Sequence, residues 1–268
     1  MHEREQHNSF EIPRTPKTCD CKICRAESRI VGLFDASFSG TDFRAGRKVG
    51  EYSGRPVYFY QCSECGFTFT RYFDAWDEAD FAEHIYNDEY LVHDPDYSGK
   101  RASEFARTLT FHFQKWSRDL AILDYGSGSG ILEYRLREAG FADVASFDPF
   151  TADSTPPSRK FNMVTCFEVF EHVTNPLLLM SNLAGLLEEG GGILLTTELC
   201  RPEIVSAGLD KWWYCVPRNG HISFQTERSM KLLGQSVGLQ YHHFGESWWH
   251  AFFPPGPKPF WLDELIPA

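Results

Sequence analysis

Apolar and polar positions follow two different periods in the second half of the chain. Short apolar runs at 120–124, 144–148 and 161–167 are bounded by glycine or polar residues, as buried strands are. The segments 100–118 and 131–139 carry apolar residues at helical spacing. Because helices and strands alternate, the pattern predicts an α/β domain with a mostly parallel sheet from about residue 100 onward.

Helices and strands also alternate in the later part of the chain. Asn175 and Pro176 provide an N-cap and a first-turn proline for a helix, which we expect to end at Gly190–Gly192. One face of this helix should carry Leu179, Leu183, Leu186 and Leu187. The remaining pattern predicts a strand over 192–197, a helix over 226–238 and two aromatic strands after it.

The first half of the chain has a different composition. It holds five of the eight cysteines of the whole chain, all before residue 66, and an aromatic, acidic segment follows them. We therefore predict an N-terminal metal-binding module at 1–75, a partly helical connecting segment at 76–99 and the α/β domain at 100–268.

The negative net charge of the chain argues against some classes of binding partner. Lys and Arg number 26 against 37 Asp and Glu, a formal charge of −11, so a nucleic-acid partner is not expected. No apolar run approaches the ~20 residues that a membrane span needs, and the first residues lack a signal-peptide core. We expect a cytoplasmic protein without a membrane partner, whose cysteines are metal ligands or free thiols. The sequence leaves the oligomeric state open.

A glycine loop is the most informative motif. The first strand ends in Asp124, and Gly126, Gly128 and Gly130 follow before a helix. Glycine lets the backbone turn sharply and lets a ligand lie against main-chain N–H groups. The second strand ends in Asp148, 22 positions after Gly126, where a carboxylate can accept both hydroxyls of a ribose.

The loop departs from the dinucleotide fingerprint, because position 131 is isoleucine rather than glycine. Its pattern resembles motif I of the class I methyltransferases, and the resemblance spans about 97–250. That likeness implies a Rossmann-like sheet and S-adenosylmethionine (SAM) as cofactor. Asp124 and the glycines would then hold the methionine end, and Asp148 the ribose. A nicotinamide enzyme and a turn without ligand are the alternatives.

The same resemblance assigns two further cofactor contacts. Related methyltransferases often have an arginine at the position of Arg101, where it pairs with the cofactor carboxylate. The third strand of the family is weak here, in the proline-containing segment 151–160, so the adenine contact is not named. Thr151 and Ala152 are the residues nearest to it in sequence.

Carboxylates and histidine gather after the strand at 161–167. Phe167 and Glu168 should lie beside the methionine moiety, and Glu171 and His172 near the acceptor. His172 could act as a general base tuned by Glu171. Alternatively, Glu168, Glu171 and His172 could hold a second divalent metal together with His221. A purely structural role is the third interpretation.

The metal interpretation rests on a resemblance. The spacing E-x-x-E-H is similar to a motif of ubiquinone-pathway O-methyltransferases and of small-RNA 2′-O-methyltransferases. In those families a later histidine completes the site, which implies the role of His221.

Two C-x2-C knuckles, Cys21/Cys24 and Cys62/Cys65, offer four thiolates for a tetrahedral zinc ion. Cys19 could replace Cys21, and a metal-free loop or a redox dithiol are alternatives. The layout resembles the zinc-binding module in front of some bacterial C-methyltransferases that act on sugar nucleotides. It implies a zinc-ribbon-like module that helps to form the substrate site.

Aromatic residues near His221 have two interpretations. Trp212, Trp213 and Tyr214 could form a lid or substrate wall, or belong to the core. Trp248 to His250 should pack in the last strands. The sequence thus predicts a SAM-dependent methyltransferase acting on a small molecule, such as a sugar nucleotide or a hydroxylated metabolite. The alternative is a degenerate SAM-binding or zinc-mediated interaction protein without catalysis.

Overall fold

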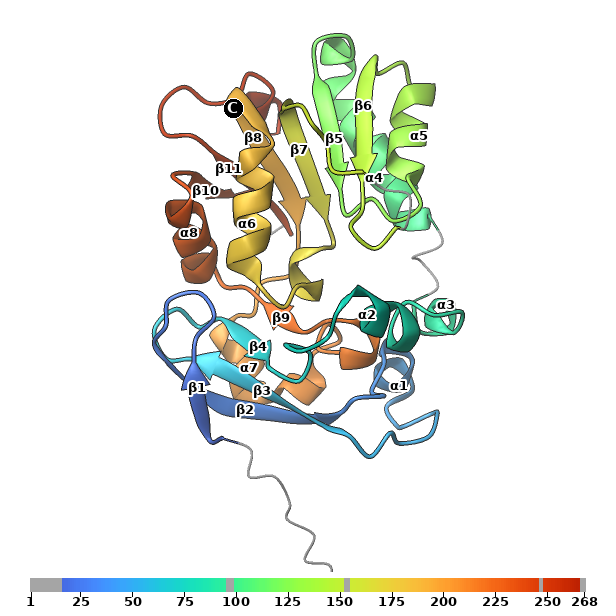
Figure 1. Cartoon of the computed structure of the whole chain (residues 1–268), viewed down its shortest axis with the longest axis vertical. Coiled ribbons are helices and arrows are strands. Elements are labelled where there is room, and N and C mark those ends of the chain that lie inside the picture. Colours follow the sequence, from blue (N-terminus) through green and yellow to red (C-terminus); the bar gives the residue numbers. More distant parts are fainter. Residues whose placement is uncertain (1–15, 95–98, 152–154, 246–247, 266–268) are drawn as a thin grey trace, which may run out of the picture.

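The computed structural model describes residues 16–94, 99–151, 155–245 and 248–265, which form two sheets, one above the other in Figure 1. The upper sheet has the strand order β10-β11-β8-β7-β5-β6. Strands β5 to β8 run parallel, and β10 and β11 are antiparallel to their neighbours. Its strands are β5 (Ala121–Tyr125), β6 (Asp143–Phe147), β7 (Phe161–Phe167), β8 (Leu187–Thr196), β10 (Gln240–His243) and β11 (Trp249–Phe253). The predicted α/β fold with a mostly parallel sheet is confirmed.

Helices cover both faces of this sheet. They are α4 (Lys100–Phe113) and α5 (Ile131–Glu138) on one face, and α6 (Pro176–Gly185) and α8 (Glu227–Ser236) on the other. Neighbouring strand residues point to opposite faces, so Leu123 packs with α6 and α8 whereas Ile122 packs with α4 and α5. Burial on both faces explains why these strands are continuous apolar runs in the sequence.

The boundary between α6 and β8 differs from the prediction. The helix begins at Pro176, where the Asn175 side chain accepts from the Leu178 N–H at 3.1 Å, but it ends at Gly185. Leu186 and Leu187 are therefore not on its face, and β8 starts at Leu187 rather than at Gly192. The glycines form a bulge inside β8, where a Cβ on Gly191 would lie 2.9 Å from the Phe161 carbonyl oxygen.

The lower sheet is antiparallel, with the order β1-β2-β3-β4-β9. Its strands are β1 (Thr18–Asp20), β2 (Glu27–Asp35), β3 (Pro56–Cys62), β4 (Thr68–Thr70) and β9 (Ser223–Phe224). Its helices are α1 (Gly40–Ala45), α2 (Glu78–His84), α3 (Tyr90–His93) and α7 (Pro202–Ala207). Short 3-10 turns are η2 (Gln114–Trp116), η3 (Phe170–His172), η4 (Leu209–Lys211), η5 (Pro217–Asn219) and η6 (Leu262–Glu264). Since β9 comes from far along the chain, the lower sheet is built from two separate segments.

Aromatic packing joins those two segments. Phe59 of β3 stacks on Phe224 of β9 with ring centroids 5.6 Å apart. Trp212 and Tyr214 are buried in the same cluster, so they are core residues, whereas Trp213 is 48% exposed. The division into 1–75, 76–99 and 100–268 stays a prediction.

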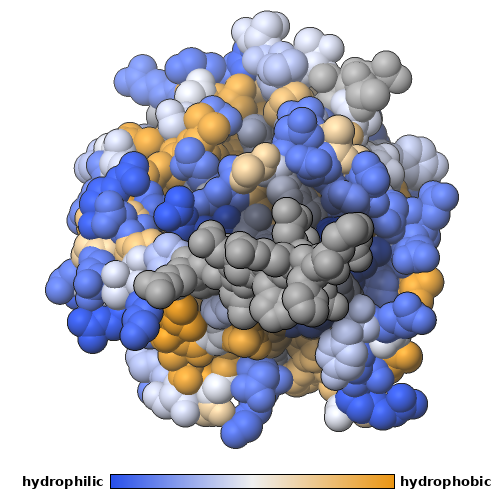
Figure 2. Space-filling model, turned by 60° about the horizontal axis from the view of Figure 1, so that its bottom comes forward, coloured by the Kyte–Doolittle hydropathy of each residue, from blue (hydrophilic) through white to orange (hydrophobic). Residues whose placement is uncertain are grey.

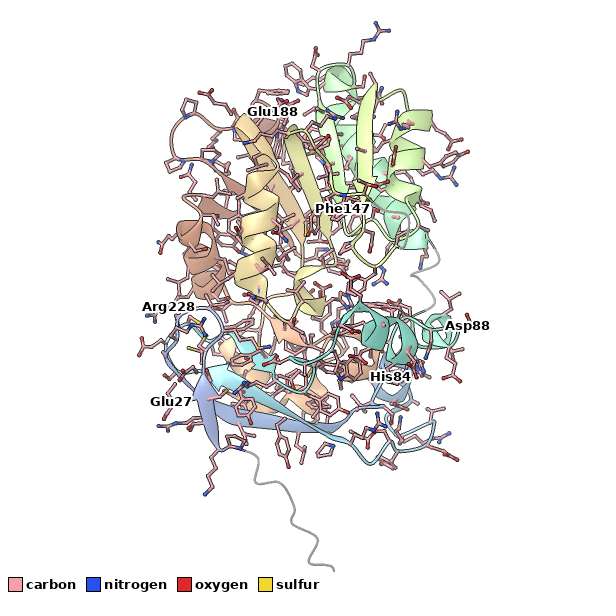
Figure 3. All side chains as sticks on the ribbon, viewed as in Figure 1. Glu27, His84, Asp88, Phe147, Glu188 and Arg228 are labelled. Atoms are coloured by element: carbon pink, nitrogen blue, oxygen red, sulfur yellow. The ribbon has the colours of Figure 1, made fainter. Side chains whose placement is uncertain are left out.

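The carboxyl ends of the parallel strands face the lower sheet (Figure 1). Phe147, which ends β6, lies toward that side in Figure 3, and Glu188, near the start of β8, lies at the far end. Ligands of open α/β sheets bind at the carboxyl ends of the strands, so a site is expected on the side of the upper sheet that faces the lower one.

No helix in the described part of the chain has the length and apolar character needed to cross a bilayer. On the face in Figure 2, hydrophilic residues surround small groups of hydrophobic ones.

Candidate active site

A cavity of about 1200 Å³ lies where the carboxyl ends of β5, β6 and β7 meet the segment containing α2 and α3. Its volume exceeds the ~300–1,000 Å³ of a typical small-molecule pocket, which leaves room for two ligands together. Most predicted site residues line it: Arg101, Asp124, Gly126, Gly128, Asp148, Phe167, Glu168 and His172.

The glycine loop has the conformation that its sequence requires. Gly126, Gly128 and Gly130 have φ values of 76°, 53° and 73°, in the left-handed region that favours glycine. A Cβ on Gly126 would lie 2.5 Å from the Val169 side chain, so no larger residue fits there. Gly130 is the N-cap of α5. The loop thus brings backbone N–H groups to the cavity.

Asp148 follows β6 directly and lies beside the glycine loop. Its carboxylate accepts from the Gly128 N–H at 2.7 Å and from the Phe150 N–H at 2.8 Å. Phe150 also lines the cavity and is 47% exposed, and sequence reasoning missed it. Thr151 lines the cavity too, whereas Ala152 lies outside the described residues.

Asp124 is buried at the end of β5. The Thr165 hydroxyl donates to it at 3.1 Å. Burial raises the pKa of this carboxyl to about 7, and the hydrogen bond from Thr165 opposes the rise. The cofactor-free protein therefore keeps a costly charge at this position at alkaline pH.

We expect Asp124→Asn to stabilise the cofactor-free protein at pH 8. The pKa of Asp124 in the folded protein, about 7, lies above the ordinary value of 3.8. The protonated carboxyl therefore makes its full contribution to the free energy of unfolding below pH 3.8. That contribution is lost as the pH rises through 7. The loss in the wild type should reach about 2–4 kcal/mol at pH 8. Thermal unfolding of both proteins from pH 4 to pH 8 measures it.

The difference in melting temperature should shrink toward pH 4. Asp119→Asn, at an exposed aspartate before β5, is the matched control and should show no such trend. A less stable Asp124→Asn at pH 8 would contradict the burial argument.

Glu168 has a strained backbone and a charged partner. Its φ of 54° is unusual for a residue other than glycine. Its carboxylate accepts from the Thr196 hydroxyl at 3.2 Å and lies 3.6 Å from the Arg101 guanidinium, which also pairs with Asp94. Burial raises the pKa of Glu168 to about 8. Sequence reasoning missed Asp94.

Glu171, His172 and His221 come together, with possible ligand atoms all within 4.8 Å of one another. Glu168 is not part of this group. His172 Nε2 lies 3.9 Å from Glu171 Oε1, and the two imidazole centroids are 4.9 Å apart. Glu171 Oε2 accepts from the Thr197 hydroxyl at 3.1 Å, whereas its buried Oε1 has no partner among the described residues.

Two tyrosines position the imidazoles. The Tyr86 hydroxyl lies 3.1 Å from His172 Nδ1, and His221 Nδ1 donates to the Tyr214 carbonyl at 2.7 Å. His221 therefore has its lone pair on Nε2. Burial lowers the pKa of His172 well below its usual value and that of His221 to about 4, so both are neutral at pH 7. Tyr86 lies in the aromatic segment, where nothing in the sequence distinguishes it from its neighbours.

The four predicted cysteines form a second group, which we call the four-cysteine cluster: Cys21, Cys24, Cys62 and Cys65. Three of its sulfur–sulfur distances are 3.4, 3.6 and 3.7 Å. A zinc ion with Zn–S bonds of about 2.3 Å requires edges of about 3.8 Å, so the thiols fit this metal. Cys19 is outside the cluster, and Cys166, Cys200 and Cys215 are free thiols in the interior.

The four-cysteine cluster is tied to the active-site cavity. Lys22, between the first two cysteines, donates to the carbonyls of Thr70 and Thr174, each at 3.0 Å, and pairs with Asp74. Thr174 lines the cavity two residues after His172. On another side, the Thr226 hydroxyl donates to the Cys65 carbonyl at 2.6 Å.

The family model described as "Methyltransferase domain" matches residues 97–243, more than half of the chain. The chain belongs to this family. The expected class I SAM-dependent methyltransferase is thereby confirmed as the family of this protein, and the matched range agrees closely with the predicted one.

One curated relative is similar to part of the chain at low identity. An O-methyltransferase of ubiquinone biosynthesis from Bordetella avium (strain 197N) is 27% identical over 115 residues, which cover 31% of this chain and 47% of the relative. The match thus spans about half the length of that enzyme.

Two solved structures are similar at low identity. The magnesium protoporphyrin IX methyltransferase of Synechocystis PCC 6803, with bound SAH, is 17% identical, with a TM-score of 0.42 over 68% of this chain and 94% of that one. An O-methyltransferase family protein from Burkholderia thailandensis is 13% identical, with a TM-score of 0.43 over 67% and 68% of the two chains.

Proposed function

We propose that this protein transfers the methyl group of SAM to a small-molecule acceptor. The observation that carries the proposal is that a single cavity joins the glycine loop and Asp148 to His172. By likeness to the family, Asp124, the glycines and Arg101 would hold the methionine end of the cofactor, and Asp148 its ribose. The relative from Bordetella avium is named an O-methyltransferase, which supports an oxygen acceptor.

We propose His172 as the general base. It borders the cavity and is neutral at pH 7, so it can take the hydroxyl proton as the oxygen attacks the methyl carbon. The bond between that carbon and sulfur breaks, its electron pair stays on sulfur, and neutral S-adenosylhomocysteine leaves. Glu171 can then stabilise the imidazolium, because its Oε1 lies 3.9 Å from Nε2. Tyr86 fixes the orientation of the ring.

One observation favours a second role for this group of residues. A buried carboxylate oxygen without a hydrogen bond is costly, and Glu171 Oε1 is such an atom among the described residues. A divalent metal held by Glu171, His172 and His221 would remove this cost and would polarise an acceptor hydroxyl when bound.

A Mn²⁺ titration separates the two roles. Because thiolates favour Zn²⁺ over Mn²⁺, the four-cysteine cluster should not take Mn²⁺. If His172 is a base without metal, calorimetry on the zinc-loaded protein should detect no Mn²⁺ at Glu171, His172 and His221. If these residues form a metal site, the wild type should bind one Mn²⁺. His172→Ala and His221→Ala should then each lose most of that affinity, since each removes one ligand.

The pH dependence provides the complementary measurement. A base whose pKa is lowered by burial keeps its activity well below pH 6.5, and loses it when the imidazole finally protonates. With a metal-free base, His221→Ala should be milder than His172→Ala. Equal damage by the two variants, together with Mn²⁺ binding, would contradict the base assignment.

We also propose that the four-cysteine cluster holds one structural zinc ion. The sulfur–sulfur distances support it, as do backbone N–H groups of Ile23, Glu64 and Cys65 that each lie 3.4 Å from a cysteine sulfur. Such N–H groups stabilise thiolate charge.

A further inference from the structure

Aromatic side chains from the segment containing α2, together with Phe150, form one wall of the cavity. The wall reaches the proposed base, because the Tyr86 hydroxyl lies 3.1 Å from His172 Nδ1. Trp76 and Phe81 lie with ring centroids 5.3 Å apart, and Phe81 and Tyr86 each contact Phe150, at 5.9 and 5.7 Å. Leu178 lines the same cavity from α6. A flat ring can bury its faces against such a wall.

This cavity is poor in cations. Arg101 is the one lysine or arginine among its described lining residues, and it is already paired with Asp94 and Glu168. Lys22, on the neighbouring knuckle, donates to protein acceptors.

A second buried cation, Arg218, is also hydrogen-bonded to protein acceptors. Arg218 donates to the Ile85 carbonyl at 2.9 Å and to the Asn87 side chain at 3.0 Å. These bonds hold the segment between α2 and α3, and they leave the guanidinium directed at the protein rather than at a ligand.

The carboxyl groups that line the cavity are more numerous: they belong to Asp77, Glu78, Asp124, Asp148 and Glu168. Because burial raises the pKa of Asp124 to about 7 and that of Glu168 to about 8, the negative charge comes mainly from Asp77, Glu78 and Asp148. An anionic ligand entering this space would lose its hydration and meet these charges of its own sign. The sulfonium cofactor, by contrast, carries positive charge and suits this field.

We infer that the methyl acceptor is a ring compound that is neutral or carries an amine, without phosphate or carboxylate. The inference rests on the proposed function and names its substrate class. It argues against the sugar nucleotides that the layout of the cysteine knuckles suggested, because a diphosphate would find no available cation among the described lining residues.

Matched probes test the inference. Tyrosol, tyramine and 4-hydroxyphenylpropionate share one phenol ring and a two-carbon arm, and they end in a hydroxyl, an amine and a carboxylate. Calorimetry should be carried out on protein saturated with S-adenosylhomocysteine, with UDP-glucose as the nucleotide probe. We expect tyramine and tyrosol to bind at millimolar concentration, and both anionic probes to bind at least about ten-fold more weakly than tyramine.

A variant that reverses one negative charge of the cavity tests the role of charge in this preference. Glu78→Lys, on a lining residue of α2, should lower the preference for tyramine over 4-hydroxyphenylpropionate by about ten-fold. Glu83→Lys is the matched control, because this glutamate lies on the same helix but does not line the cavity. The control should keep the wild-type preference.

Three results would overturn the inference: an anionic probe that binds as tightly as tyramine, equal effects of the two lysine variants, or no binding of any phenol. Binding of S-adenosylhomocysteine is measured first. Failure at that step would refute the proposed function itself, so the two failures are distinguishable.

Discussion

Asp148→Ala should weaken the binding of S-adenosylhomocysteine by about 100-fold or more. A carboxylate that accepts two ribose hydroxyls contributes hydrogen bonds worth ~1.5–3 kcal/mol each, and alanine leaves both hydroxyls without that partner. The Gly128 N–H, which donates to Asp148 at 2.7 Å, also loses its acceptor, so the loop becomes less ordered. Isothermal titration calorimetry on the purified protein gives the dissociation constants.

Asp143→Ala is the control for this change. Asp143 begins the same strand β6, but it is an exposed partner of Arg159 and does not line the cavity. Its variant should bind with wild-type affinity. A wild-type protein that does not bind S-adenosylhomocysteine, or an Asp148→Ala protein within a few-fold of wild type, would contradict the cofactor assignment.

Cys65→Ser should cause the largest loss of stability of any change considered. Metal binding at a four-thiolate site is coupled to folding and is worth ~10–16 kcal/mol in isolated zinc modules. Three remaining thiolates bind zinc poorly, and Cys65 is fully enclosed between the knuckles and α8. We expect zinc content to fall from one per chain to well below half. The melting temperature should fall by roughly 10 °C.

Cys19→Ser is the matched control, since Cys19 lies two residues from Cys21 but outside the four-cysteine cluster. It should keep both zinc and stability, whereas Cys21→Ser should lose them. Elemental analysis and thermal unfolding provide the two readouts. A stable wild-type protein without metal would refute the zinc proposal.

Local chemistry explains which features the sequence could predict. The glycine loop depends on φ values that only glycine adopts easily, and the strands β5 and β7 are apolar because both of their faces are covered. The cap formed by Asn175 and Pro176 also needs no tertiary information. These features could therefore be read from short segments alone.

Features that depend on distant segments were not predictable. Gly190 to Gly192 suggested a helix end, but the close approach of β7 makes them a bulge in a strand. The partner of His172, Tyr86, comes from a distant segment that nothing in the sequence connects to it. Tyr214 is near His221 in the sequence, but the contact between its carbonyl and the imidazole depends on how the chain turns between them. Glu168 lies outside the group formed by Glu171 and the two histidines, and it is near Arg101 of α4, a distant segment of the chain.

The fifth strand of the lower sheet has a consequence for how such a chain could arise. Thr68 and Phe69 of β4 pair with Phe224 and Ser223 of β9, which lies beyond most of the α/β domain. Recombination that transplanted the first 75 residues alone would leave that edge of the sheet open. The two parts therefore depend on each other structurally, and we expect that a functional chimera between relatives would need to exchange the segment around β9 along with the cysteine knuckles.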